Sequence, residues 1–283
     1  MKRFFILASA AIVALASCAK TEVVYKDAPE QIAFKQITDV MTKSTHTLSS
    51  GVLGVFANQV DAVYFGNTPF TWTTDAFTAD QYWPYSGTLD FTVYYPYVDG
   101  ATYVENVLTI PNVTADDAHY YGSQRYIGAS KGASAQAVVL KHVSAAIEIV
   151  DNLGSLYTLQ SVTLNNAPSS GTVTVTYEAD GTNPVVTTNT GFTTSNPTCM
   201  GTTVYVLPGR QTSFTVGFKQ NAGTGVYSVN VPLAGTDVAP NMWVSNNKYT
   251  YTLTVSDAGK ISFTATVVDF DPVSQGAEVA PEL

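Results

Sequence analysis

Apolar side chains occupy every second position over most of the chain, which is the period of a β-strand with one buried and one exposed face. Within 171–178, Val173, Val175 and Tyr177 share one face, and the positions between them are threonine. The same alternation recurs at 214–218, 227–231, 249–255 and 261–267. We expect the last two segments to pair as a hairpin, because the short, glycine-containing loop 256–260 joins them.

The N-terminal half has the same character with less regular spacing. Candidate strands, separated by turns that contain Pro or Gly, lie at 31–36, 51–57, 89–95 and 103–110. The segment 113–124 holds a possible helix start, but the long crossover helices of a parallel sheet are missing. Many short strands with frequent turns predict an all-β fold of antiparallel β-sandwiches. The small, polar segment 128–137 marks a boundary, so we expect two domains in tandem, 44–135 and 136–283.

The first residues predict export. A basic pair precedes an apolar run, 4–16, that is too short to cross a bilayer as a permanent helix, so we interpret 1–17 as a signal peptide. It ends in Leu, Ala, Ser and Cys, which resembles the bacterial lipobox, so Cys18 is predicted to carry lipid and to become the new N-terminus. An ordinary signal peptide with a chance cysteine is the alternative. With Cys18 acylated, Cys199 has no partner for a disulfide.

The composition limits the partners. Of the 283 residues only 12% are charged, with 13 Lys and Arg against 22 Asp and Glu, and 12% are aromatic. A disordered chain has more charge and fewer aromatic residues, and a nucleic-acid-binding surface needs clustered basic side chains. Both classes are therefore excluded. The basic residues are also unevenly placed, since none occurs between Lys43 and Arg125.

The chain holds no pattern typical of a metal site or a cofactor site. Its three histidines, His46, His119 and His142, do not follow the spacing of zinc ligands. Asp116, Asp117 and His119 lie close enough in sequence to hold a metal or supply a base, but an exposed polar loop is the simpler interpretation. Phosphate-binding glycine loops and the nucleophile elbow of hydrolases are also missing. We therefore expect no metal, no cofactor and no catalytic centre.

Two other functions stay open at this point. The aromatic runs 82–85 and 94–97 could stack on sugar rings if they were exposed, as in a surface lipoprotein that binds glycans, but they could instead fill a sandwich core. Glu148, Glu178 and Asp180 lie near predicted strands, and two of them could act as the paired carboxylates of a glycosidase. We rank the glycosidase below the glycan-binding lipoprotein.

Several segments, in their order along the chain, resemble the fimbrillin family, the subunits of lipoprotein-derived type V pili in Bacteroidia. They are the lipobox at Cys18, then Ile32-Ala33-Phe34, Met41-Thr42-Lys43-Ser44, Gly54-Val55-Phe56-Ala57, Tyr94-Tyr95-Pro96-Tyr97, His142 with the strand after it, Val206-Leu207-Pro208-Gly209, and the closing hairpin up to Val268-Asp269-Phe270. Two positions depart from the family pattern, because Lys43 stands where the family has Arg and Phe270 stands where it has Trp.

The resemblance implies two β-sandwich domains of the transthyretin type, exported to the outer membrane and cell surface through lipid on Cys18. It also implies that a trypsin-like protease cuts between Lys43 and Ser44 and removes 18–43, which comprises a polar tether and the first strand. The implied function is that of a pilus subunit or pilus-associated adhesin, with other pilus subunits and the membrane as partners. The role as stalk, anchor or tip stays open, and so does the adhesion target.

Removal of that strand has a physical consequence. If Ile32 and Phe34 complete the first sandwich, their loss leaves unpaired backbone groups beside exposed apolar pockets. A strand from the next subunit would restore the hydrogen bonds and refill the pockets, so that subunits polymerise by strand exchange. The tail 271–283 is one candidate for the donor strand, but it is poor in apolar residues and could equally be a frayed end.

Overall fold

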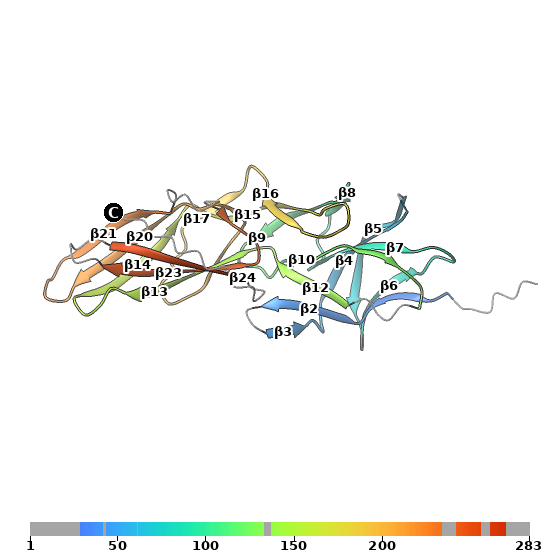
Figure 1. Cartoon of the computed structure of the whole chain (residues 1–283), viewed down its shortest axis with the longest axis horizontal. Helices are drawn as coiled ribbons and strands as arrows, with labels where there is room; N and C mark the ends of the chain where they lie inside the picture. Colours follow the sequence, from blue (N-terminus) through green and yellow to red (C-terminus); the bar gives the residue numbers. More distant parts are fainter. Residues whose placement is uncertain are drawn as a thin grey trace, which may run out of the picture.

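The computed structural model describes residues 29–41, 44–60, 62–132, 137–233, 242–255 and 261–269. Every regular element in these ranges is a β-strand, so the prediction of an all-β fold is confirmed. The body is elongated, with β6 (Phe77–Tyr82) towards one end, β2 (Gln36–Met41) nearer the middle, and β14 (Tyr157–Asn165) and β21 (Val226–Pro232) towards the other end (Figure 1). None of the described ranges contains a helix long and apolar enough to cross a membrane.

The largest sheet has ten strands and uses the N-terminal half of the chain. Its path runs through β1 (Gln31–Phe34), β6, β5 (Ala62–Trp72), β4 (Val52–Gln59), β7 (Leu89–Tyr95), β10 (Tyr120–Gly122), β12 (Ala137–His142), β2 and β3 (Ser44–Thr47), and β11 (Tyr126–Ala129) pairs with β7 beside this path. The strand predicted at 89–95 is confirmed with the same bounds.

The two ends of this sheet come together. β1 starts the path and β2 is its last strand but one, yet only Lys35 separates the two strands in the chain. The sheet therefore curls back on itself and surrounds a core to which Ile32 and Phe34 of β1 and Ile37 of β2 all contribute. The other members include Leu53, Val55, Phe65, Phe70, Phe77, Leu89, Phe91, Val93, Val138 and Leu140.

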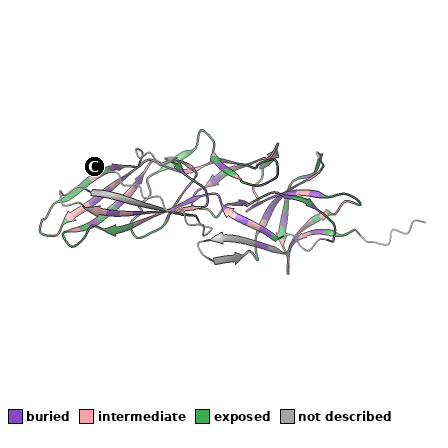
Figure 2. Cartoon of the chain, in the orientation of Figure 1, coloured by how far each residue is buried: buried purple, intermediate pink, exposed green. Residues whose placement is uncertain are grey.

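A second core is formed by two smaller sheets of the C-terminal half. One sheet has the path β18 (Val204–Val206), β13 (Ala145–Asn152), β23 (Asn247–Val255) and β24 (Ile261–Asp269), and the other has the path β14, β20 (Ser213–Gln220) and β21. The predicted C-terminal hairpin is confirmed, because β23 and β24 pair along their whole length. Inward residues of both sheets, such as Ile147, Phe214 and Tyr251, are buried in this core, and buried and exposed positions alternate along the strands (Figure 2). The short strands β19 (Gly209–Arg210) and β22 (Met242–Trp243) pair with each other.

A third sheet joins the two halves of the chain. Its path is β16 (Val185–Thr188), β15 (Ala167–Thr176), β9 (Val107–Thr114) and β8 (Thr102–Val104), and β17 (Thr193–Ser195) pairs with β15 beside it. β9 belongs to the first half of the chain and β15 to the second, and they pair directly, with Ile110 opposite Val173 and Leu108 opposite Val175. As the alternation predicts, Val173, Val175 and Tyr177 are buried, in a third core with Leu108 and Ile110.

Two expectations concern the segments that join these sheets. Where 113–124 held a possible helix start, the structure instead has the end of β9 and the strand β10. The boundary expected between 135 and 136 falls in 133–136, which lies outside the described ranges. β12, which follows it, belongs to the ten-stranded sheet. The division into domains 44–135 and 136–283 stays a prediction.

Gly54 of β4 lies opposite Tyr94 of β7, whose ring is fully buried. A Cβ atom at residue 54 would lie 2.0 Å from Cε1 of that ring. We therefore expect Gly54→Ala to lower the free energy of unfolding by about 1–3 kcal/mol through overpacking, as measured by urea denaturation. Gly66→Ala in β5 is the control, because no atom lies within 4 Å of its added Cβ. Equal losses for the two variants would contradict this explanation.

Candidate functional site

The N-terminal strands β1 and β2 pair with other strands of the ten-stranded sheet and contribute side chains to its core. Ile32 and Phe34 are each 1% exposed, and Ile37 is fully buried. The ring of Phe34 packs edge-on against Phe70 and Phe91, with 5.4 Å between the ring centroids in both pairs. Burying each of these side chains contributes roughly 1.5–3 kcal/mol. The segment therefore supplies a substantial part of the first core.

Backbone pairing holds this segment on both sides. β1 is antiparallel to β6, and the amide of Trp83 donates to the carbonyl oxygen of Glu30, at 2.9 Å, just before β1 begins. β2 is parallel to β12, with Ile37 opposite Val138, and antiparallel to β3. The residues 31–41 thus cover one edge of β6 and one edge of β12 at the same time.

The other predicted processing residues are placed as follows. Ser44 is the first residue of β3. Lys43, the lipidation residue Cys18 and the signal peptide 1–17 lie outside the described residues, as does the tail 271–283.

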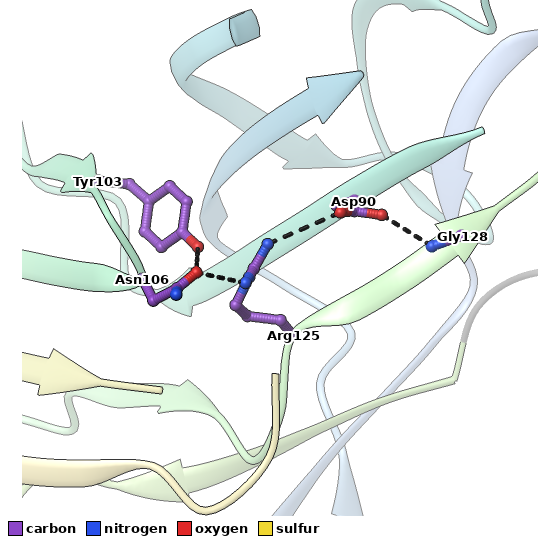
Figure 3. Close-up of polar contacts among 5 residues, drawn as sticks. All are labelled: Asp90, Tyr103, Asn106, Arg125 and Gly128. Atoms are coloured by element: carbon purple, nitrogen blue, oxygen red, sulfur yellow. Dashed lines mark hydrogen bonds and ion pairs between the residues drawn. The ribbon is translucent and has the colours of Figure 1, made fainter. Parts of the chain in front are cut away.

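Arg125 is the first basic residue after Lys43, and its side chain is only 8% exposed. Its Nη1 donates to Oδ1 of Asn106 at 2.5 Å, its Nη2 lies 3.7 Å from Oδ2 of Asp90, and its guanidinium lies 5.5 Å from the ring centroid of Tyr103. The other carboxylate oxygen of Asp90 accepts a hydrogen bond from the amide of Gly128 at 2.8 Å (Figure 3). Sequence reasoning missed this cluster, although a lone aspartate in the apolar run 89–95 was a possible signal.

The cluster joins β7, β8 and β11 with the turn between β8 and β9. Asp90 belongs to β7, Asn106 to the turn between β8 and β9, and Arg125 directly precedes β11. Burial raises the pKa of the Tyr103 phenol, and the neighbouring guanidinium opposes this shift. Because the Arg125 side chain is buried and paired, it is a poor substrate for a trypsin-like protease in the folded protein.

The group Asp116, Asp117 and His119 is only partly the exposed loop that we expected. Both aspartates are exposed, but His119 is 6% exposed. Burial lowers the pKa of His119, and Asp117 opposes the shift. In the part of the chain that the structure describes, no three His, Cys, Asp or Glu side chains come together to hold a metal ion.

His142 is buried between aromatic rings at the end of β12. Its ring centroid lies 4.3 Å from that of Tyr120 and 6.4 Å from that of Tyr205. Its backbone amide donates to Oδ1 of Asn246, at 3.0 Å. This residue therefore ties the ten-stranded sheet to the turn that precedes β23, which sequence reasoning did not predict.

Acid should weaken the packing of the buried His142 ring. Burial lowers the pKa of His142 from 6.5 to about 4, so between these values the unfolded chain binds a proton that the folded protein excludes. The free energy of unfolding should then fall as the pH drops below about 6.5 and level off near pH 4, a loss of roughly 3 kcal/mol from this group. Urea denaturation of the wild type and of His142→Gln at pH 7, 5.5 and 4 measures it. A variant as acid-sensitive as the wild type would show that other groups are responsible.

The three carboxylates of the glycosidase hypothesis each have a structural partner. Glu148 on β13 forms an ion pair with Lys248 on β23, at 2.8 Å. Glu178 accepts a hydrogen bond from Asn183 at 3.2 Å. Asp180 accepts bonds from the backbone amide and hydroxyl of Thr182, and these bonds lower its pKa.

The two aromatic runs differ in their surroundings. In the second run Tyr94 is fully buried, its hydroxyl donates to Oδ1 of Asn67 at 2.7 Å, and burial raises its pKa to about 12. In the first run Trp83 packs edge-on against Phe91, with 5.7 Å between ring centroids, whereas Tyr82 and Tyr85 are 40% and 87% exposed. Trp83, Tyr94 and Tyr95 therefore serve the cores, whereas Tyr82 and Tyr85 face solvent.

Together, the curled sheet, its inserted N-terminal strands and the shared third sheet define a class of all-β protein whose first strand completes the sheet. The chain belongs to the fimbrillin-like family, whose model matches residues 31–269. The resemblance read from the sequence is thereby confirmed, and the protein is a fimbrial or adhesin-type structural protein of the cell surface.

Solved structures agree with this assignment at the level of the fold. A candidate cell adhesion protein from Bacteroides uniformis matches with a TM-score of 0.55 and 22% identity, over 85% of this chain and 98% of that chain. A candidate cell adhesion protein from Bacteroides ovatus matches with a TM-score of 0.51 and 14% identity, over 86% of this chain and 98% of that chain. No curated protein sequence matches this chain.

Proposed function

We propose that this protein is a pilus subunit that is exported as a lipoprotein through Cys18, cut after Lys43, and assembled by strand exchange. The observation that supports this most directly is the position of β1 and β2. They contribute three buried side chains to the first core, yet they precede the proposed cut and can leave without breaking any later part of the chain.

The cut would open one continuous groove. Loss of β1 frees an edge of β6, and loss of β2 frees an edge of β12. β3, which begins at Ser44, also loses its pairing with β2. Free edges beside empty apolar pockets are the conditions under which a strand from another chain adds to a sheet.

The groove sets a requirement for the donor strand. The side chains that it must replace are those of Ile32, Phe34 and Ile37, so apolar residues are needed at i, i+2 and i+5. The apolar residues Val273, Val279 and Leu283 of the tail 271–283 do not repeat this spacing. The donor strand is therefore not assigned to a segment. A strand with apolar residues at i, i+2 and i+5 would fit the groove best.

Cleavage of the purified precursor by a trypsin-like protease tests the proposal. The expected first product starts at Ser44, as read by N-terminal sequencing, and electron microscopy should then show polymers. Lys35, Lys131 and Arg210 are also exposed, so the order of cuts in a time course is the informative quantity. Polymers without a cut near residue 43, or a Ser44 product that stays monomeric, would overturn the proposal.

Two lysine variants make a matched pair. Lys43→Ala should stay monomeric, because a cut after Lys35 alone removes β1 and leaves β2 on the edge of β12. Lys35→Ala keeps the proposed site and should polymerise as the wild type does.

A separate experiment tests lipidation. Cells fed labelled palmitate should label the wild type and Cys199→Ala but not Cys18→Ala. Undiminished label on Cys18→Ala would show that another residue carries the lipid.

A further inference from the structure

The sheet β14-β20-β21 has a polar depression on the face turned away from its core. The depression has a volume of about 540 Å³. It is lined by Thr163, Asn165, Asn166, Asn196, Ser213, Thr215 and Asn230. All seven side chains are amides or hydroxyls, and none is charged or aromatic. The strand residues between them, such as Leu164 and Phe214, point to the opposite face and are fully buried.

Asn165 forms a fixed floor for this depression. Its Nδ2 lies 3.0 Å from Oγ of Ser213, 3.0 Å from Oγ1 of Thr215 and 3.2 Å from Oδ1 of Asn230. The hydroxyl of Thr215 in turn donates to Oδ1 of Asn165, at 3.2 Å. These bonds cross all three strands of the sheet, so the floor is held before any ligand arrives.

The rim offers polar groups that the fold does not use. Asn166 stands at a φ of 51° in the turn after β14, and its backbone amide donates to Oδ1 of Asn196, at 2.7 Å. Within the described ranges, the side-chain amide of Asn166 and Nδ2 of Asn196 and of Asn230 make no hydrogen bond, and neither does the hydroxyl of Thr163. Donors and acceptors therefore stand side by side around a rigid floor.

We propose that this depression, which we call the asparagine site, binds a neutral saccharide. Each sugar hydroxyl can donate and accept a hydrogen bond, which matches amides and hydroxyls that offer both functions. The absence of charged and apolar lining residues disfavours ionic and hydrophobic ligands. The depression is shallow and open to solvent, so it would hold a mono- or disaccharide from one side only.

The asparagine site lies apart from both the N-terminal groove and the aromatic runs 82–85 and 94–97. The sheet β14-β20-β21 lies in the left half of Figure 1, whereas β2 and β6 lie in the right half. None of the lining residues belongs to the ten-stranded sheet. An adhesin could therefore use the asparagine site while its N-terminal groove is filled.

Amide NMR of the full-length, isotope-labelled protein tests the asparagine site. The probes are methyl α-mannoside, methyl β-galactoside and N-acetylglucosamine, with glucuronate as a charged comparison. We expect at least one neutral sugar to shift the side-chain amide signals of Asn166, Asn196 and Asn230 with saturation. No saturable shift with any of the three, or tighter binding of glucuronate, would overturn the proposal.

A double variant, Asn166→Gly with Asn196→Asp, separates binding from folding. Glycine tolerates the positive φ of residue 166, and aspartate keeps the acceptor for its backbone amide while removing the Nδ2 donor. The loss of these amides should weaken sugar binding about tenfold, by hydrogen-bond energies of about 0.5–1.5 kcal/mol each. Gln160→Ala, an exposed change on the same strand, should bind as the wild type does.

Sugar affinity that is equal in the double variant and the wild type would exclude the asparagine site. Should the double variant fail to fold, Thr163→Val provides the same comparison by removing one hydroxyl. Neither change touches β1, β2 or Lys43, so polymerisation after cleavage should be retained. A failure of sugar binding is therefore distinguishable from a failure of strand exchange.

Discussion

Phe34→Ala should lower the free energy of unfolding of the precursor by about 3–5 kcal/mol, which is typical of a large-to-small change in a core. The ring is almost fully buried between Phe70 and Phe91, on β5 and β7. β1 has only four residues, and its pairing with β6 limits how far it can move to fill the cavity. The same side chain matters for the proposed strand exchange, because the donor strand must refill the pocket that Phe34 occupies.

Urea denaturation of the uncut precursor measures this loss. Lys35→Ala is the control, since this neighbouring side chain is exposed and its loss should change stability by no more than about 0.5 kcal/mol. A Phe34→Ala loss as small as that of Lys35→Ala would mean that β1 contributes little to the first core, and the strand-exchange proposal would lose its main support.

Asp90→Ala should make the bond after Arg125 cleavable. The substitution removes the ion pair with Nη2 of Arg125 and the acceptor for the amide of Gly128. Hydrogen bonds to charged groups contribute about 1.5–3 kcal/mol, and Asp90 is partly exposed, so we take the lower end of this range. Local opening, and with it the rate of cleavage, should then rise about tenfold, because 1.4 kcal/mol corresponds to a factor of ten.

The measurement is a time course of digestion by a trypsin-like protease, with mass spectrometry of the fragment that starts at Tyr126. Asp75→Ala removes an exposed carboxylate far from Arg125 in the chain and should leave this rate unchanged. If the wild type were cut after Arg125 as fast as Asp90→Ala, the buried cluster would not protect the domain, and the sparse basic residues would be a matter of composition alone.

The sequence predicted strands better than it predicted their pairing. A period of two is a local property, so the segments around Val173, Phe214 and Tyr251 could be assigned before their neighbours were known. Pairing between β9 and β15, or between β2 and β12, joins residues far apart in the chain and leaves no mark on the local pattern. The curled path of the largest sheet was therefore not predictable by this reasoning.

The candidate sites show the same difference between what the local sequence reveals and what only the tertiary structure reveals. The local pattern gave a candidate strand at 31–36, the resemblance to the fimbrillin family singled out Ile32 and Phe34 within it, and both are buried. The burial of Arg125 and His119 was not expected, because polar residues next to turns are usually exposed. For Arg125, the partners Asp90 and Asn106 come from other elements, and only the tertiary structure brings them near.

The pairing of β9 with β15 also has a mechanical consequence. Two globular units joined by a flexible linker bend and stretch independently under flow, and such relative motion is the usual behaviour of consecutive domains. Here the ladder from Ser170 opposite Thr114 to Thr176 opposite Val107 ties one half of the chain to the other. Separating the two halves requires every pair of this ladder to break. In the proposed pilus, each subunit would therefore transmit tension with little stretching between its halves.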